Sequence, residues 1–193
     1  AARAAERLAV LWIDAHADLN WPEVSPSGRI HGMILGASLG RGPRALTQLA
    51  GPAPKVRPED AYLFGLCLLD PGERAWIAEG EIQAVTVDDI DALRLDAALE
   101  RIACNIARSG ADALHVSLDV DVLNEQVMPG TGSRHWGGLT ARELARVIRR
   151  LRAAELPVRS LDVVELDPTL DPTGASTRLA AALLARALGE TVR

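Results

Sequence analysis

Short apolar runs rich in β-branched residues alternate along the chain with longer segments whose apolar positions recur every three to four residues. This alternation is typical of parallel strands covered by helices. The predicted strands cover residues 8–13, 61–66, 82–87, 113–118 and 158–164, and the predicted helices cover 31–39, 71–78, 89–109, 141–154 and 175–188. The pattern therefore predicts an α/β fold with a mainly parallel sheet.

Capping signals mark two of the predicted helix starts. Thr140 is followed three positions later by Glu143, the spacing of a capping box, and Asp88 is expected to cap the helix 89–109. Residues 40–58 contain several Gly and Pro residues without a period, which predicts a surface connection. Residues 1–7 resemble the last turns of a helix. Either the chain begins inside a larger fold, or an ordinary α/β domain opens here with a short helix.

Length and composition indicate one folded domain over residues 1–193. With 48% hydrophobic and 24% charged residues, the bulk of the chain is not disordered. The 21 basic residues are scattered and the net charge is −5, so no basic surface for nucleic acid is indicated. The apolar runs are far shorter than the roughly 18–20 residues that cross a bilayer, and the N-terminus lacks the apolar core of a signal peptide. We therefore expect a cytoplasmic protein without nucleic-acid or membrane partners.

The two cysteines give a separate indication. Cys67 and Cys104 each have apolar neighbours in the sequence, so we expect reduced, buried thiols and no disulfide framework. Two cysteines are also too few for a structural zinc site built on thiolates.

Polar residues alternate at the end of the first predicted strand, at Asp14, His16 and Asp18. Extended backbone places all three side chains on one face at the strand's carboxyl end, which is the edge where open parallel sheets bind ligands. Carboxylates packed this closely repel one another unless a cation neutralises them. The alternative is a solvated turn after a strand.

The strand 113–118 runs in the same way into Asp119 and Asp121. Two such strand ends at one rim favour a shared divalent metal site over two independent surface turns. Carboxylate oxygens with one imidazole suit Mn²⁺, Fe²⁺ or Co²⁺. His115 lies further back on this strand, where a buried hydrogen bond behind the ligands is expected rather than direct ligation.

The strand 158–164 brings a third carboxylate, Glu165, to the same rim. A carboxylate at this position could hold a cationic group of a substrate. It could equally be a surface acid before a loop, and the residues alone leave both interpretations open.

Several segments occur together in the order of one known family. They are Asp14-Ala15-His16-Ala17-Asp18, Ser117-Leu118-Asp119-Val120-Asp121 with Pro129-Gly130-Thr131-Gly132, and the acid Glu165 in a Asp-Val-Val-Glu segment. With them the chain resembles the manganese-dependent ureohydrolases over essentially its whole length. The arginase branch is indicated by Asn20, Ser27-Gly28-Arg29-Ile30-His31-Gly32 and Asp70-Pro71-Gly72-Glu73.

The resemblance implies a three-layer α/β/α fold of the arginase type with two Mn²⁺ ions at the carboxyl edge of the sheet. Asp14 and Asp119 would bridge the ions, His16 and Asp121 would complete one of them, and Asp18 would serve the other. Metal-bound hydroxide would attack the guanidinium carbon of a small guanidino substrate. Arginine would then give urea and ornithine.

The resemblance also implies roles in substrate handling. His31 would carry a proton to the leaving amine, because imidazole exchanges protons near neutral pH. Glu165 would pair with the guanidinium, and Asp18 is counted with these two among the catalytic residues. The implied substrate-binding residues are Asn20 and Ser27 at the α-carboxylate, Asp70 and Glu73 near the α-amino group, and Thr131.

The chain departs from the family's pattern at several points. The GGDHS motif, whose histidine is the remaining ligand of the first metal, is absent, and the histidines of the chain are at 16, 31, 115 and 135. We therefore expect one complete metal site in an N-terminally incomplete fold that corresponds to the C-terminal two-thirds of the family fold. The other departures are Arg29, Cys67-Leu68-Leu69, Asn124-Glu125 and Arg134-His135-Trp136.

These departures leave activity and substrate open. The leading hypothesis is an arginase-like metallohydrolase. The alternatives are an impaired homologue that binds a metal or a guanidino compound or regulates a partner, a hydrolase of agmatine or formimidoylglutamate, and a generic α/β module with solvated acidic turns. An incomplete sheet would expose a strand edge or an apolar helix face, so we also expect homo-oligomers or aggregation.

Overall fold

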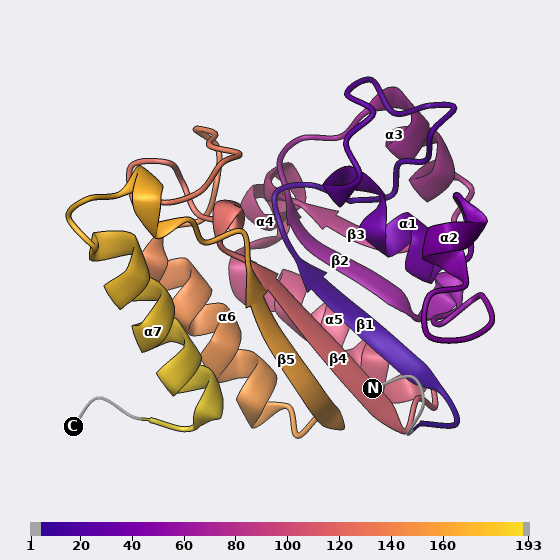
Figure 1. The fold of residues 1–193 in the computed structure, drawn as a ribbon. Coiled ribbons are helices and arrows are strands. Elements are labelled where there is room, and N and C mark those ends of the chain that lie inside the picture. Colours follow the sequence, from indigo (N-terminus) through magenta and orange to yellow (C-terminus); the bar gives the residue numbers. More distant parts are fainter. Residues whose placement is uncertain (1–4, 191–193) are drawn as a thin grey trace.

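The computed structural model describes residues 5–190, and within them five parallel strands form one sheet. The strands are β1 (Leu8–Ile13), β2 (Ala61–Leu66), β3 (Gln83–Thr86), β4 (Ala113–Asp119) and β5 (Val158–Val164), in the spatial order β3-β2-β1-β4-β5. All carboxyl ends of the strands therefore point to the same edge, which is the upper edge in Figure 1. The predicted α/β fold with a parallel sheet is confirmed.

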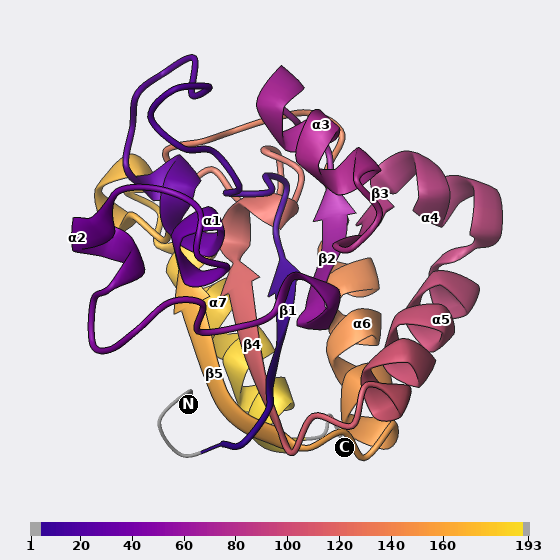
Figure 2. The same cartoon turned by 90° about the vertical axis from the view of Figure 1, so that its right-hand side faces the viewer.

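Helices cover both faces of the sheet (Figures 1 and 2). The short helix α1 (Ile34–Ser38) and α3 (Pro71–Ala78) pack on one face, with α2 (Arg44–Thr47) beside α1. The other face is covered by α4 (Val87–Leu93), α5 (Leu95–Arg108), α6 (Ala141–Ala153) and α7 (Ala175–Leu188). The sheet is thus the middle layer of three.

The alternation along β1 explains why both faces are covered. Leu11 and Ile13 are buried against the helices α5 to α7, whereas Val10 is buried against α1 and α3. Period-two burial on both faces requires an apolar layer on each side, since neither set of side chains is left to water. The helix α6 meets this need with buried Leu144, Val147, Ile148 and Leu151 at helical spacing.

The end strands of the sheet differ in exposure. β3 has a buried Val85, whereas β5 has no fully buried residue, and its first residue, Val158, is 46% exposed. Within residues 5–190, β5 pairs with β4 alone. The free side of β5 is therefore an open parallel edge, and self-association of the chain stays a prediction.

One helix prediction was wrong in its boundaries. The region 89–109 contains two helices, α4 and α5, separated at Arg94, whose φ of 69° breaks the helical geometry. Asp88 lies inside α4, and the cap is Thr86, whose side chain accepts a hydrogen bond from the Asp89 backbone N–H. The predicted capping box of Thr140 and Glu143 is confirmed.

Four smaller expectations also need correction. Residues 5–7 form a loop with bends and no helix, and residues 1–4 lie outside the described part of the chain. The segment 31–39 is a 3₁₀ turn (His31–Met33) followed by α1, and the connection 40–58, which is largely exposed as predicted, contains the unexpected helix α2. Cys104 is exposed and Cys67 is only half-buried, so neither thiol is buried as expected.

None of the helices in residues 5–190 combines the length and apolarity needed to cross a membrane.

Candidate active site

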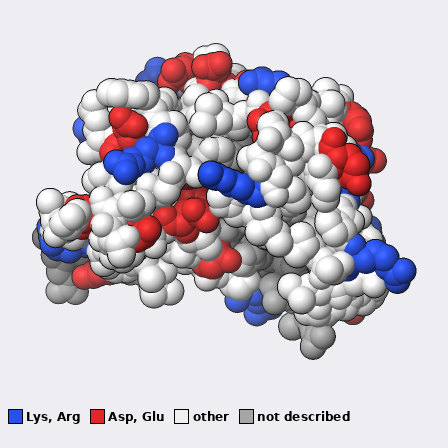
Figure 3. All heavy atoms as spheres, turned by 45° about the horizontal axis from the view of Figure 1, so that its top comes forward, with Lys and Arg blue, Asp and Glu red and all other residues white. Residues whose placement is uncertain are grey.

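The loops that follow β1, β2, β4 and β5 surround a cavity of about 130 Å³ at the carboxyl edge of the sheet. Figure 3 views this edge and shows acidic atoms gathered in the hollow at its centre. The side chains and backbone that line the cavity come from Asp14, His16, Asp18, Asn20, Ser27, His31, Gly32, Asp70, Glu73, Asp119, Asp121, Ser133 and Glu165. Residues up to 151 positions apart in the sequence, such as Asp14 and Glu165, are thus brought to one place.

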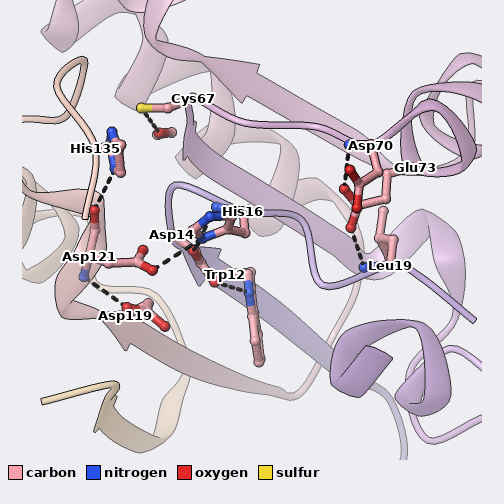
Figure 4. A network of polar contacts seen from close by, with 11 residues as sticks. Trp12, Asp14, His16, Leu19, Cys67, Asp70, Glu73, Asp119, Asp121 and His135 are labelled. Atoms are coloured by element: carbon pink, nitrogen blue, oxygen red, sulfur yellow. Dashed lines mark hydrogen bonds and ion pairs between the residues drawn. The ribbon is translucent and has the colours of Figure 1, made fainter. Parts of the chain in front are cut away.

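Asp14, His16 and Asp121 form the tightest group in this cavity (Figure 4). One ligand atom from each lies within 4.8 Å of the others, and His16 Nδ1 is 3.1 Å from Asp121 Oδ2 and 3.4 Å from Asp14 Oδ1. Asp14 directly follows β1, and its carboxylate accepts hydrogen bonds from Trp12 Nε1 at 2.8 Å and from the His16 backbone N–H at 2.7 Å. The bend over residues 14–16 that follows β1 therefore fixes Asp14 and turns His16 toward Asp121.

Asp119 and Asp121 are fixed by the way β4 ends. After Asp119 the chain enters a 3₁₀ turn (Val120–Val122), because Asp119 Oδ1 accepts a hydrogen bond of 2.8 Å from the Asp121 backbone N–H. Asp121 is 2% exposed, and its Oδ1 has no hydrogen-bond partner among the described residues. Asp119 lines the same cavity, although it lies outside the group of three.

Burial and crowding raise the pKa of three of these acids. Burial raises the pKa of Asp14 to about 6, that of Asp18 to about 8 and that of Asp119 to about 10. The neighbouring charge of Asp14 adds to the effect at Asp18 and Asp119. Burial lowers the pKa of His16, but its contacts with Asp121 and Asp14 outweigh this and raise it to about 11. Without a cation, these acids retain protons that isolated carboxyls would have lost.

A divalent cation fits this donor set. Buried carboxylates crowd this wall, and Oδ1 of Asp121 has no partner among the described residues. A bound positive charge would offset their mutual repulsion. Oxygen ligands with a single imidazole suit Mn²⁺ and similar ions better than a thiolate-preferring metal. Asp14, His16 and Asp121 could hold one cation, and Asp18 and Asp119 extend the acidic wall beside it.

Asp70 and Glu73 are held in a different way. Glu73 Oε1 accepts a hydrogen bond of 3.0 Å from the Leu19 backbone N–H, and its Oε2 accepts one of 2.9 Å from the Asp70 backbone N–H. Asp70 Oδ2 accepts one of 2.9 Å from Asn20 Nδ2. Glu73 is 3% exposed, and although burial raises its pKa, both of its oxygens have donors. These residues tie the loop after β1 to the start of α3.

Asp18 and Glu165 share an unusual backbone. Their φ angles are 52° and 60°, in the left-handed region that costs residues with a Cβ about 1 kcal/mol or more. Both line the cavity, so the strained backbone occurs at two of its walls. The packing of the surrounding loops has to maintain it.

The cavity brings together all the predicted site residues except Thr131. Thr131 is buried outside the cavity lining, and its hydroxyl has no partner among the described residues. Sequence reasoning missed Ser133, which lines the cavity two positions further along the same loop. Alternation of polar residues at 131 and 133 could have indicated it. The expectation of a buried hydrogen bond from His115 behind the ligands was wrong, because His115 is half-buried outside the cavity, with Nδ1 2.8 Å from Ser160 Oγ and Nε2 3.2 Å from Asp162 Oδ2.

A model of the arginase family matches residues 1–189. The chain belongs to the arginase family. The curated arginase of Bacillus caldovelox is 41% identical over 185 residues, an alignment that covers 96% of this chain and 61% of that protein. The arginase of Staphylococcus aureus strain COL is 40% identical over the same share of this chain and 60% of its own length.

Solved structures of the arginase family agree with the fold. The native structure of Bacillus caldovelox arginase at pH 5.6 superposes with a TM-score of 0.95 at 40% identity, covering all of this chain and 64% of that one. The structure of Bacillus cereus arginase gives a TM-score of 0.94 at 36% identity. The chain thus has the arginase-type α/β fold and spans about 60% of the length of the curated relatives it matches.

Proposed function

We propose that this arginase-family chain carries the catalytic edge of a manganese-dependent ureohydrolase that converts arginine to urea and ornithine. The observation that carries the proposal is the convergence of half-buried His16 with buried Asp14 and Asp121 at the carboxyl edge, where Oδ1 of Asp121 has no partner among the described residues. The arginases of similar sequence support the substrate class. When bound, divalent cations in such a site supply a water molecule activated for attack near neutral pH.

The proposed ligands follow from their contacts. Asp14, His16 and Asp121 would hold one cation, because their ligand atoms already converge within 4.8 Å. Asp119 would share its charge between this cation and a second one, and Asp18 would serve the second, since both are crowded acids on the same wall. Trp12 Nε1 keeps Asp14 oriented throughout, at 2.8 Å from Asp14 Oδ2.

The rest of the cavity would hold and protonate the substrate. Glu165 lies on the wall contributed by β5 and would accept hydrogen bonds from the guanidinium nitrogens. His31 is exposed at the cavity and would deliver the proton that the leaving amine needs. The amino-acid end of the substrate would meet Asn20, Ser27, Asp70 and Ser133, with Glu73 holding the loops that present them.

Urea release from the purified chain tests the proposal. At saturating Mn²⁺ we expect urea from arginine, less from agmatine, and none after removal of the metal with a chelator. Glu165→Gln should reduce turnover by about 100-fold or more while leaving Mn²⁺-dependent thermal stabilisation intact. Asp167→Asn is the matched control, because it removes a charge two positions away and keeps the oxygen that accepts from the Thr169 backbone N–H. If the chain releases urea from neither arginine nor agmatine nor another guanidino compound, the enzymatic proposal is refuted.

A second candidate function is a non-catalytic homologue that binds a metal or a guanidino compound. One observation favours it: within residues 5–190, a single group of three ligand side chains converges closely enough for a metal. Metal stoichiometry separates the two candidates. Two Mn²⁺ ions per chain with measurable urea support the enzyme, whereas one ion without urea supports the binding protein.

A further inference from the structure

His135 lies behind the proposed metal ligands, on the loop that departs from the family's motif after Pro-Gly-Thr-Gly (Figure 4). It is 8% exposed, and its Nε2 is 2.7 Å from the backbone oxygen of Asp121. Its ring also stands edge-on to that of His16, with the centroids 6.4 Å apart and the planes at 85°. One side chain thus touches two of the three converging ligands.

The direction of the hydrogen bond follows from the partner. A carbonyl oxygen only accepts, so Nε2 of His135 carries the hydrogen and donates it. The backbone N–H of Asp121 already donates to Asp119 Oδ1 at 2.8 Å. Both backbone polar groups of Asp121 are therefore held, while Oδ2 faces His16 and Oδ1 has no partner.

His135 is itself anchored to the segment that follows Asp121. Its backbone oxygen accepts a hydrogen bond of 3.0 Å from the Glu125 backbone N–H, and the neighbouring Trp136 oxygen accepts one from Asn124 Nδ2. The loop is thus fastened to the chain on the far side of the 3₁₀ turn. His135 therefore contacts the chain on both sides of the turn, at the Asp121 carbonyl through its imidazole and at Glu125 through its backbone oxygen. These two contacts fix the turn that carries Asp121.

We propose that His135 is a positioning residue that holds the Asp121 turn and the His16 ring in place for a divalent cation. The inference rests on the metal-binding part of the proposed function. Residues that orient metal ligands from behind typically change metal affinity by about 10- to 100-fold when they are replaced. His135 does so through a backbone carbonyl and a ring edge, contacts that a similarly sized apolar side chain cannot supply.

Mn²⁺ affinity of the purified chain, measured by calorimetric titration, tests this role. His135→Leu keeps the volume but removes the donor, and we expect it to weaken Mn²⁺ binding by about 10-fold or more. His135→Gln supplies an amide N–H for the Asp121 carbonyl and should recover affinity to within about threefold of the unaltered chain. His115→Leu is the matched control: it removes a histidine whose contacts are with Ser160 and Asp162, and should leave the affinity unchanged.

The outcomes separate the two proposals. A purely structural role would lower the metal-free melting temperature of His135→Leu without changing the affinity of the folded protein for Mn²⁺, and that result would overturn the inference alone. If His135→Leu does not fold, His135→Met takes its place with the same expectation. Absence of Mn²⁺ binding by the unaltered chain would overturn this inference and the metal-binding part of the proposed function together.

Discussion

Two groups of buried acids lie in the same cavity and differ in what surrounds them. Asp119 and Asp121 are 5% and 2% exposed, and Oδ1 of Asp121 has no partner among the described residues. Glu73 is 3% exposed and receives a backbone N–H on each oxygen. Burial alone therefore does not identify a ligand-binding acid. The donors to Glu73 are backbone N–H groups of two loops, so this carboxylate stabilises those loops, whereas Asp121 has an oxygen that is available to bind a cation.

The largest expected effect is the loss of metal-dependent stability in Asp119→Asn. In the unaltered chain, Mn²⁺ at a thousandfold excess over its Kd should add about 4.1 kcal/mol to the free energy of unfolding. The variant should lose this gain. Its metal-free form should be at least as stable as the unaltered chain, because a crowded, buried acid has been removed.

Thermal unfolding with and without Mn²⁺ measures this effect. Asp91→Asn, an exposed acid on α4, is the control and should retain the full stabilisation. If Asp119→Asn destabilised the metal-free chain, the distinction between the two groups of acids would be wrong.

Glu73→Ala should show the opposite behaviour. It removes two hydrogen bonds to a charged group and leaves two backbone N–H groups without their acceptor, so we expect a loss of about 2–4 kcal/mol. The loss should be the same with and without Mn²⁺ and is measured by urea denaturation. Arg74→Ala, the exposed neighbour on α3, should change stability by less than about 0.5 kcal/mol.

The sequence alone predicts which acids reach the cavity, but it does not predict which of them stabilise loops. Alternation at Asp14, His16 and Asp18 after an apolar strand locates these residues at the cavity. The expected extended backbone was wrong, because residues 14–16 form a bend and Asp18 has a φ of 52°. The role of Glu73 could not be predicted, since its donor at Leu19 lies 54 positions away. The contact of His135 with Asp121 likewise depends on a loop path that no periodicity encodes.

The pH dependence of stability gives a third test. Asp14, Asp18 and Asp119 have folded pKa values of about 6, 8 and 10, above the ordinary 3.8, so the folded chain keeps protons that the unfolded chain has lost. Their contribution to stability therefore falls as pH rises from about 4 to 10. His16, raised from 6.5 to about 11, has the same sign: its stabilisation is complete below 6.5 and disappears as pH passes 11.

Urea denaturation at pH 6 and pH 9 measures this dependence. The metal-free chain should be less stable at pH 9, and saturating Mn²⁺ should remove the decrease, because the cation replaces the protons. Asp119→Asn should show a smaller decrease than the unaltered chain. Metal-free stability that rises between these two pH values would contradict the assignment of the acids.

The smallest expected effect comes from replacing a hydrogen-bond donor of Asp70 with a second acid. Asn20→Asp replaces the amide that donates to Asp70 Oδ2 at 2.9 Å with a second carboxylate. We expect a loss of about 1–3 kcal/mol in urea denaturation, because the change removes the donor and sets a second carboxylate against Asp70. Asn20→Ala is the control, because it removes the donor without adding a charge and should lose less.

The left-handed backbone at Asp18 and Glu165 has a consequence for protein engineering. A design guided only by stability would place Gly or Asn at every such position, and Arg94 and Glu155, which lie outside the cavity, are suitable targets for this change. The same replacement at 18 and 165 would relieve about 1 kcal/mol each and remove two acids from the cavity. Thermostabilising libraries of this chain should therefore vary positions 94 and 155 and keep 18 and 165 fixed.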